Sequence, residues 1–184
     1  MSDLLAIHRL VWTALLAALI AAGAFIAIPL PLSPIPVTLQ TLFIVLAGLI
    51  LGPKYGVFAV LLYIIAGAFG LPIFSGGKGG VGVLLGPTGG YFAGFIVSVL
   101  ISAKARKLSL LPATLLCFVG LMLLLSLGSL RLAQVLNIPV SQGFALGLVP
   151  FVPGGVLKTF CALAIFKFLR ANRLLPMDYQ RPYD

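Results

Sequence analysis

The sequence predicts an all-α membrane protein, built as a single domain over residues 1–184 that folds into a bundle of six transmembrane helices. Apolar residues make up 61% of the chain and charged residues 8%, whereas a soluble domain carries about 25% charged residues. Long apolar runs also alternate with short turns that are rich in proline and glycine. Because one membrane crossing takes about 20 residues, a chain of 184 residues accommodates about six crossings with short connections.

The first three helices are predicted at about residues 4–28, 38–51 and 55–69. Four prolines fall in the segment 29–36, directly after the first helix. Each proline lacks a backbone N–H donor and restricts the residue before it, so this segment is predicted to be a non-helical turn. The sequence GPK at 52–54 separates the second helix from the third for the same reason.

The last three helices are predicted at about residues 88–103, 111–130 and 154–169. A glycine-rich loop at residues 70–87 precedes them, and we expect it on the outer side of the membrane. Dense glycines allow the backbone to approach a ligand or a neighbouring loop closely. The apolar residues among them predict a packed loop that seals a site, and Thr88 is the predicted N-cap of the fourth helix.

The basic residues predict the orientation of the bundle. If the N-terminus is cytoplasmic, only Lys78 and Arg131 fall on the outer side. This agrees with the excess of basic residues found in cytoplasmic loops, so both termini are predicted to be cytoplasmic. The second, fourth and sixth helices then begin at the outer face, with their free N–H groups and positive dipole ends there. The inner side receives nine basic residues: Arg9, Lys54, Lys104, Arg106, Lys107, Lys167, Arg170, Arg173 and Arg181.

Lys158 is the main candidate for a binding residue, because it lies inside the apolar run 156–166 and has no acid nearby. The chain has three acidic residues, Asp3, Asp178 and Asp184, and all are near its ends. A lysine at membrane depth costs roughly 2.5–3.5 kcal/mol on insertion scales. It must therefore extend to the interface, lose its proton or bind an anion that the protein does not supply. We favour the third alternative, which predicts a cationic pocket reached from outside.

Several function classes find no support in the residues. His8 is the one histidine of the chain, so no metal site is predicted. A membrane enzyme that uses Cys161 or Lys158 lacks a partner base, and we expect no catalytic activity. The formal G-x-G-x-x-G at 77–82 lacks a strand–turn–helix context, so we expect no dinucleotide cofactor. The basic residues lie at helix ends instead of forming one patch, so no nucleic-acid partner is expected.

Small residues recur on one face of the first helix. Ala14, Ala18 and Ala22 are spaced by four residues, and small residues at this spacing let another membrane helix approach closely. Two readings remain open: packing against this protein's own helices, or contact with a partner subunit.

Four segments of the chain resemble one family of membrane proteins. These segments are PVTLQTL at 36–42, LGPKYG at 51–56, GLPIFSGG at 70–77 and GPTGGY at 86–91. They are similar to segments of the BioY family, the biotin-binding S components of energy-coupling factor (ECF) transporters. The resemblance extends from the first predicted helix to the sixth.

The resemblance implies a multi-pass protein of the bacterial cytoplasmic membrane that captures biotin on the outer side. Its implied partners are a transmembrane coupling protein and two ATPase subunits, with toppling in the membrane releasing the vitamin inside. The chain itself would need no cofactor, because ATP would be used only by the partners. The alternative is a facilitator for biotin or another small carboxylate that works alone, without a partner at the alanine stripe.

The resemblance also implies roles for individual residues. Lys158 corresponds to the lysine that receives the biotin carboxylate, and the alanine stripe (Ala14, Ala18 and Ala22) corresponds to the contact with the coupling protein. Gly155 stands where the family commonly has an aspartate that faces the ureido ring. Recognition of that ring would then shift to other groups, and a biotin precursor is the alternative substrate. The full set of predicted ligand-binding residues is Lys158, Gln40, Lys78, Gly79, Thr88, Tyr91 and Phe92, of which Phe92 and Lys78 replace an arginine and an asparagine of some relatives.

Overall fold

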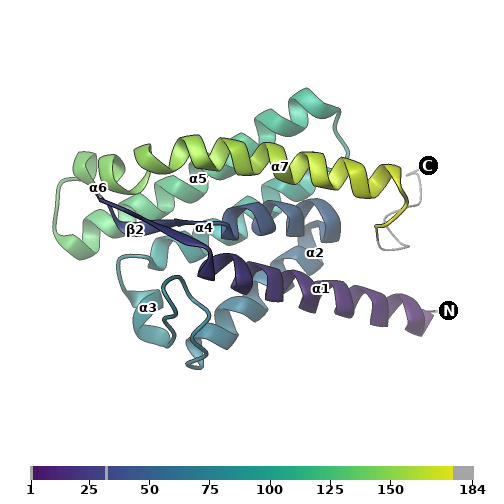
Figure 1. Ribbon diagram of the computed structural model, residues 1–184, viewed down its shortest axis with the longest axis horizontal. Coiled ribbons are helices and arrows are strands. Elements are labelled where there is room, and N and C mark those ends of the chain that lie inside the picture. Colours follow the sequence, from purple (N-terminus) through teal and green to yellow (C-terminus); the bar gives the residue numbers. More distant parts are fainter. Residues whose placement is uncertain (1, 32, 176–184) are drawn as a thin grey trace.

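The computed structural model describes residues 2–31 and 33–175, and these residues are mainly helical (Figure 1). The helices α1, α5 and α7 run along the long axis of the molecule, and α1 begins at the end where α7 finishes. Asp178, Asp184 and Arg181 lie outside the described residues. In chain order the elements are α1 (Ser2–Phe25), β1 (Ala27–Leu30), β2 (Ser33–Thr38), α2 (Gln40–Ala68), α3 (Val81–Leu85), α4 (Gly89–Ala105), α5 (Leu110–Leu136), α6 (Val140–Gly147), the 3-10 helix η1 (Val149–Phe151) and α7 (Val152–Ala171).

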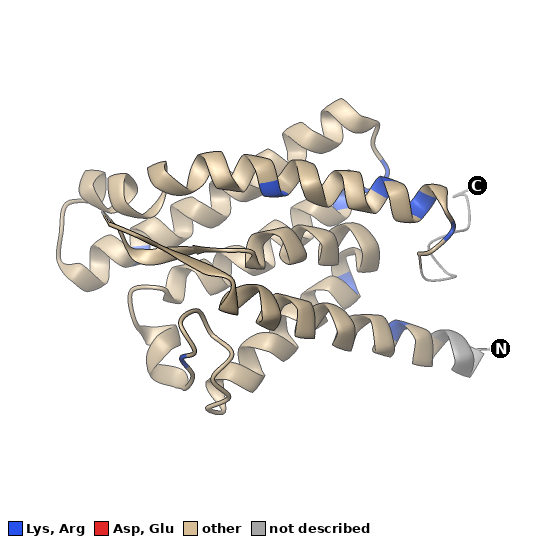
Figure 2. Ribbon diagram, viewed as in Figure 1, with Lys and Arg blue, Asp and Glu red and all other residues tan. Residues whose placement is uncertain are grey.

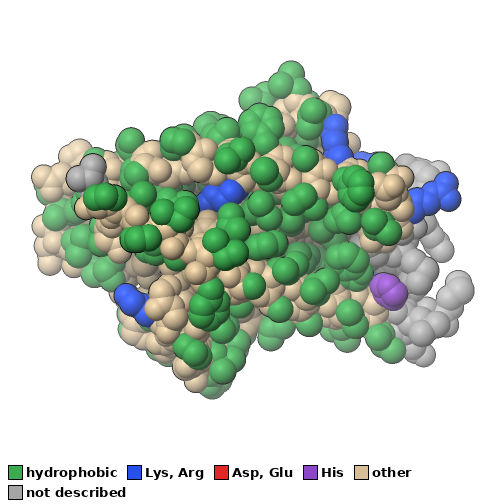
Figure 3. Space-filling view, in the orientation of Figure 1, with side chains coloured by type: hydrophobic (Ala, Val, Ile, Leu, Met, Phe, Trp, Pro, Cys, Tyr) green, Lys and Arg blue, Asp and Glu red, His purple; other side chains and the backbone are tan. Residues whose placement is uncertain are grey.

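The membrane all-α class is confirmed, although the six predicted spans do not match the elements one for one. Four helical segments in the described part of the chain are long and apolar enough to cross a membrane: Ala6–Phe25, Gln40–Ala68, Leu110–Leu136 and Val140–Ala171. Helix α4 is apolar but shorter. Hydrophobic side chains are spread over the whole visible face in Figure 3, as expected for a surface that meets lipid.

The second and third predicted helices form one element, α2, with a sharp kink. Gly52 has φ 74° and ψ −172°, and Pro53 follows it. A positive φ is readily adopted by glycine, and proline is well suited to the first position of the helical segment that continues from it. The predicted break is therefore real, but it is confined to the kink.

The proline-rich segment is non-helical, as predicted, but it forms a β-hairpin. Strands β1 and β2 are antiparallel, with Ala27 opposite Thr38 and Leu30 opposite Ser33. Two-stranded pairing leaves every strand with a free edge, where proline is tolerated. The hairpin also explains why α1 ends at Phe25, before the predicted residue 28.

Helix α4 lies between α2 and α5 because glycines remove side chains at both contacts. A Cβ atom on Gly48 of α2 would collide with Ser102 Oγ of α4. On the other side, a Cβ atom on Gly94 of α4 would lie 2.8 Å from Leu124 Cα of α5. Small residues at such contacts are typical of packed membrane helices. The close contacts place α4 in the interior, next to the cavity described below.

The glycine-rich loop is packed instead of loose. Within residues 70–87 it contains α3 and an isolated bridge between Phe74 and Lys78. The Phe74 side chain is fully buried, and its ring centroid lies 4.8 Å from that of Phe92 and 5.5 Å from that of Tyr63. Glycines with positive φ turn the backbone around this ring, among them Gly76 (φ 77°). The loop is therefore fixed against α2 and α4.

Basic residues are concentrated at one end of the molecule. In Figure 2 most lysines and arginines lie near the end that holds the start of α1 and the finish of α7, and few lie toward the opposite end. No acidic residue occurs between residues 4 and 177 of the sequence. This distribution is the one that the predicted orientation requires.

Candidate ligand-binding cavity

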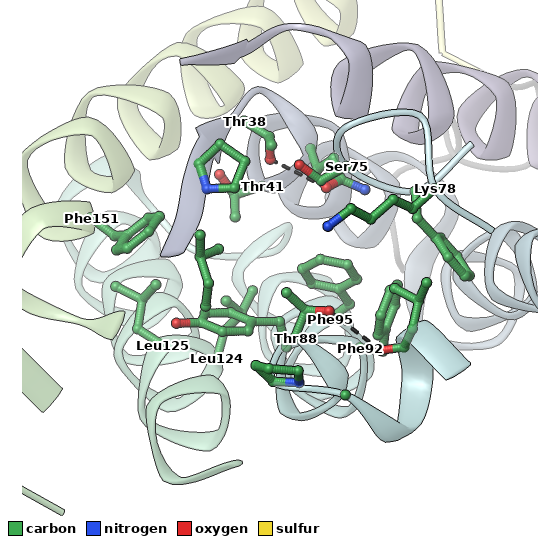
Figure 4. A pocket seen from close by; sticks show the side chains of 18 of the residues that line it. Thr38, Thr41, Ser75, Lys78, Thr88, Phe92, Phe95, Leu124, Leu125 and Phe151 are labelled. Atoms are coloured by element: carbon green, nitrogen blue, oxygen red, sulfur yellow. Dashed lines mark hydrogen bonds between the residues drawn. The ribbon is translucent and has the colours of Figure 1, made fainter. Parts of the chain in front are cut away.

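A cavity of about 480 Å³ lies among β2, the start of α2, the glycine-rich loop, α4, α5 and α7 (Figure 4). Small-molecule sites are typically about 300–1,000 Å³ and mostly apolar, with a few placed polar groups. The residues that line it are Pro34, Ile35, Pro36, Thr38, Gln40, Thr41, Tyr63, Phe74, Ser75, Lys78, Gly82, Val83, Gly86, Pro87, Thr88, Tyr91, Phe92, Phe95, Leu121, Leu124, Leu125, Phe151, Gly155 and Lys158.

The cavity has two chemically different sides. Figure 4 shows Thr38, Thr41, Ser75 and Lys78 together along one side. Gln40 and Lys158 hydrogen-bond to Thr38 and belong to the same side. We call these six residues the polar wall. The opposite side, the apolar wall, is formed by Phe92, Phe95, Leu124, Leu125 and Phe151.

Lys158 is held by a backbone carbonyl. Its Nζ atom donates a hydrogen bond of 2.8 Å to the carbonyl oxygen of Thr38, at the end of β2. An ammonium group has three donors, so this bond occupies one of them. This backbone acceptor is not among the three alternatives predicted from the sequence, which are an interface, a lost proton and an external anion. Since a carbonyl carries no formal charge, the positive charge of Lys158 is solvated in part but not neutralised.

Gln40 is part of a short hydrogen-bond chain within the polar wall. Thr38 Oγ1 donates to Gln40 Oε1 at 3.2 Å, and Gln40 Nε2 donates to the hydroxyl of Tyr63 at 2.6 Å. Gln40 and Tyr63 are both buried. The two bonds fix the orientation of the amide, so Gln40 lines the cavity as predicted while half of its hydrogen-bonding capacity serves the protein.

Tyr91 and Phe92 lie in the first turn of α4 and line the cavity with their rings. The Tyr91 hydroxyl donates to the carbonyl of Gly147 at 2.7 Å, which ties α4 to α6. Phe92 packs against Phe74 and, with ring centroids 5.6 Å apart, against Phe95. Both predicted residues therefore supply apolar surface to the cavity.

Thr88 and Gly79 differ in detail from what the sequence predicts. Thr88 occupies the N-cap position of α4 but makes no side-chain cap bond, so the predicted capping role is wrong. Its hydroxyl donates instead to the carbonyl of Val83 at 3.3 Å, because α3 brings that carbonyl within reach. Gly79 is not among the cavity-lining residues. Added atoms there would collide with the carbonyl of Leu71, so Gly79 shapes the loop from outside the cavity.

Lys78 extends from the loop into the cavity. Its backbone carbonyl accepts a hydrogen bond of 2.8 Å from the N–H of Phe74, which holds the start of the side chain in place. The cavity therefore has two lysines on its polar wall and no carboxylate among its lining residues.

Comparison with known proteins identifies the family. Residues 1–175 match the sequence model of the BioY family. The chain belongs to the BioY family. It is 38% identical over 178 residues to the biotin transporter BioY of Thermotoga maritima, covering 95% of this chain and 99% of that protein. It is also 38% identical over 160 residues to a probable biotin transporter BioY of Pyrococcus horikoshii, covering 86% and 94% of the two chains.

A solved structure supports the same assignment. The crystal structure of the S-component for biotin from an ECF-type ABC transporter superposes with a TM-score of 0.85 at 29% identity. The match covers 93% of this chain and 95% of that one. The resemblance inferred from the sequence segments is therefore confirmed. BioY proteins are transporters and not enzymes, and this chain is a multi-pass membrane protein of that family.

Gly155 accounts for one departure of this BioY chain from the family pattern. A Cβ atom at this position would lie 2.7 Å from Leu121 Cδ2, and both residues line the cavity. The Leu121 side chain thus occupies the space that a larger residue at 155 would need. This part of the cavity presents apolar surface in place of a carboxylate.

The alanine stripe faces outward in this BioY structure. Ala14, Ala18 and Ala22 are exposed, whereas Leu16 and Ile20 on the other face of α1 are buried. Packing within this chain therefore does not cover the three alanines. The exposed position is the one that a contact with a partner subunit requires.

Two hydroxyl groups of the polar wall escaped the sequence analysis. Thr41 and Ser75 lie in segments that carry the BioY resemblance, but nothing in the sequence distinguishes them from neighbouring hydroxyls. Phe95, Leu124 and Phe151 were missed as well, because apolar residues in apolar helices give no signal of their own. Their roles emerge only from the cavity.

Proposed function

We propose that this chain is the substrate-binding subunit of an ECF transporter and captures biotin for uptake. The observation that carries the proposal is an amphipathic cavity, with two lysines on one wall and aromatic and aliphatic residues on the other, in a chain of the BioY family. Biotin is an amphipathic acid, with a carboxylate on an aliphatic tail and a ring system that has a polar urea edge and an apolar thioether edge. The cavity offers a matching surface to each part.

In this proposal Lys158 binds the biotin carboxylate. Its charge has no acidic partner between residues 4 and 177, and its bond to Thr38 leaves donors for a ligand. A charge-assisted hydrogen bond to a carboxylate is roughly twice as strong as a neutral one. Gln40, Lys78, Thr88, Tyr91 and Phe92 complete the binding residues, and Gly79 supports the loop that closes over the ligand.

The proposed partners are a transmembrane coupling protein and two ATPase subunits. The exposed stripe of Ala14, Ala18 and Ala22 gives the coupling protein a flat face on which to pack. ATP is then bound and hydrolysed by the ATPase subunits alone. The excess of basic residues at one end favours cytoplasmic termini and a cavity that opens outward, in the cytoplasmic membrane of a bacterium.

Equilibrium binding to the purified protein tests the proposal. Biotin is expected to bind with higher affinity than dethiobiotin, which keeps the urea and the carboxylate but lacks the thioether. Absence of biotin binding would refute the proposed function, and tighter binding of dethiobiotin would identify a precursor as the substrate. Co-purification from cells that express candidate partners tests the assembly. Biotin uptake into vesicles that contain this chain alone would instead establish a self-sufficient facilitator.

A further inference from the structure

Two hydroxyl oxygens at the cavity lack a hydrogen-bond partner within the described structure. They are Thr41 Oγ1 and Ser75 Oγ, and both oxygens are buried. Both residues line the cavity. Buried hydroxyl groups are nearly always hydrogen-bonded, and leaving one unbonded destabilises the protein. Each of these two oxygens therefore calls for a partner that the protein itself does not provide.

The neighbouring hydroxyls of the same cavity have partners. Thr38 Oγ1 donates to Gln40, and Thr88 Oγ1 donates to the carbonyl of Val83. Gln40 is in turn engaged with Tyr63. Only Thr41 and Ser75, among the described cavity-lining threonines and serines, are left without a bond. Among these threonines and serines, unsatisfied hydrogen-bonding capacity is thus confined to Thr41 and Ser75.

These two positions are rigidly held on separate elements. Thr41 lies in the first turn of α2, next to the buried Gln40. Ser75 follows Phe74, whose ring is fully buried between α2 and α4. Figure 4 shows both side chains on the same side of the cavity. Because both oxygens are buried in the ligand-free structure, a ligand reaches them after rotation about χ1, which redirects either hydroxyl between staggered positions without moving the backbone.

We propose that Thr41 and Ser75 are specificity-determining residues that hydrogen-bond the urea group of the ligand. This inference rests on the proposed function, since it takes biotin as the ligand. A cyclic urea has two N–H donors and one carbonyl acceptor. The lysines of the polar wall have only donors, so they cannot accept from the urea N–H groups. A hydroxyl both donates and accepts, and these two hydroxyls have that capacity unused.

In this proposal, two parts of the polar wall bind different groups of the ligand. Lys158 binds the carboxylate, and the hydroxyls of Thr41 and Ser75 hydrogen-bond the urea at another place on the same wall. Because the two hydroxyls come from α2 and from the loop, the bound urea bridges these elements. A carboxylic acid of similar length without a urea would leave both hydroxyls unbonded, as they are in the ligand-free protein, and would bind more weakly than biotin because it gains no bond from them.

Isosteric removal of each hydroxyl tests the proposal. Thr41→Val, Ser75→Ala and the double variant are compared with Thr41→Ser and Ser75→Thr, which keep the hydroxyls. Biotin and dethiobiotin affinities of the purified proteins are measured by calorimetry, and the affinity for lipoic acid, a valeric acid on a sulfur ring without a urea, by competition. We expect each hydroxyl removal to weaken both urea ligands by about tenfold, and the double variant by about a hundredfold. Affinity for lipoic acid should stay unchanged, and the hydroxyl-retaining variants should bind biotin within about threefold of the wild type.

Thermal stability of the ligand-free variants separates binding from packing. Removing an unbonded buried hydroxyl should leave the melting temperature equal or higher, so affinity and stability move in different directions. Ser129→Ala is the matched control, because Ser129 is a fully buried serine that does not line the cavity. It should leave the biotin affinity unchanged.

The outcomes are distinct. If wild-type protein binds biotin but the hydroxyl-lacking variants bind it equally well, the inference is wrong and the proposed function stands. The inference is also wrong if Thr41→Ser loses as much affinity as Thr41→Val, or if stability and affinity for all three ligands fall together. If the wild-type protein does not bind biotin, the proposed function fails, and the assignment of a urea to these residues fails with it.

Discussion

The two walls of the cavity are built from different kinds of structure. The polar wall comes mainly from places where regular structure begins or ends: the end of β2, the first turn of α2 and the glycine-rich loop. The apolar wall comes mainly from positions within α4 and α5, such as Phe95 and Leu124. Phe151, in the 3-10 helix, completes it.

This difference separates shape from selectivity. The apolar wall is continuous with the buried core, since Phe92, Phe95, Leu124 and Leu125 pack in one cluster with Tyr63 and Phe74. Its shape is therefore maintained by the packing that stabilises the fold. The polar wall holds an un-neutralised lysine and two unbonded hydroxyls. We infer that the apolar wall supplies affinity to any ligand of the right shape, while the polar wall selects among such ligands.

Removal of the Lys158 ammonium, on the polar wall, should cause the largest loss of biotin affinity. Truncating one partner of a buried charged hydrogen bond costs about 2–5 kcal/mol, so Lys158→Ala should weaken biotin binding by about a hundredfold or more. A neutral biotin amide should lose much less. Lys167→Ala is the control, because Lys167 is exposed on the same helix and does not line the cavity. Equal losses for acid and amide would show that Lys158 does not bind the carboxylate.

A change in the apolar wall should have a smaller and less selective effect. Phe95→Leu removes part of a buried ring, which should weaken binding by about threefold to tenfold through lost apolar contact. Biotin and dethiobiotin should be affected by the same factor, in affinity measurements on the purified protein. Phe168→Leu makes the same substitution at an exposed site outside the cavity and should leave affinity unchanged. Strong discrimination between ligands in Phe95→Leu would argue against the separation of roles.

Bulk on the alanine stripe should have the smallest effect on binding, because the stripe lies outside both walls. Ala18→Trp is expected to leave biotin affinity within about twofold of wild type, yet to abolish biotin uptake in cells by preventing a close helix contact. Ala17 provides the contrast, since it is buried and Ala17→Trp should overpack the bundle and lower the melting temperature. Normal uptake by Ala18→Trp would exclude the stripe as a partner interface.

The sequence was most informative where the physical constraint is local. The membrane class follows from apolar runs, the kink in α2 from Gly52 and Pro53, and the importance of Lys158 from the lack of acids between residues 4 and 177. Each of these signals depends on residue type alone. The alanine stripe is a further example. Its four-residue spacing predicts that the three alanines share one face of the first helix, but it does not predict what packs on that face.

Interactions that depend on how distant parts of the chain pack together were not predictable from residue type. The acceptor of Lys158 is the carbonyl of Thr38, 120 residues away, and every residue has a carbonyl. The β-hairpin was missed because prolines argue against strands in general and only the pairing shows that they are tolerated here. Thr41 and Ser75 were missed because a hydroxyl without a partner looks, in sequence, like any other hydroxyl.

Helix α2 has a mechanical consequence for the cavity. Its two halves meet at the kink at Gly52. The hydrogen bond from Gln40, in the first half, to Tyr63, in the second half, joins them away from this kink. Widening of the kink at Gly52 would break this buried hydrogen bond, so the bond braces this side of the cavity against opening. The glycine-rich loop is fastened to the second half of the same helix, since the N–H of Gly80 donates to the carbonyl of Gly67 at 2.7 Å, so the brace also helps to hold the loop at the cavity.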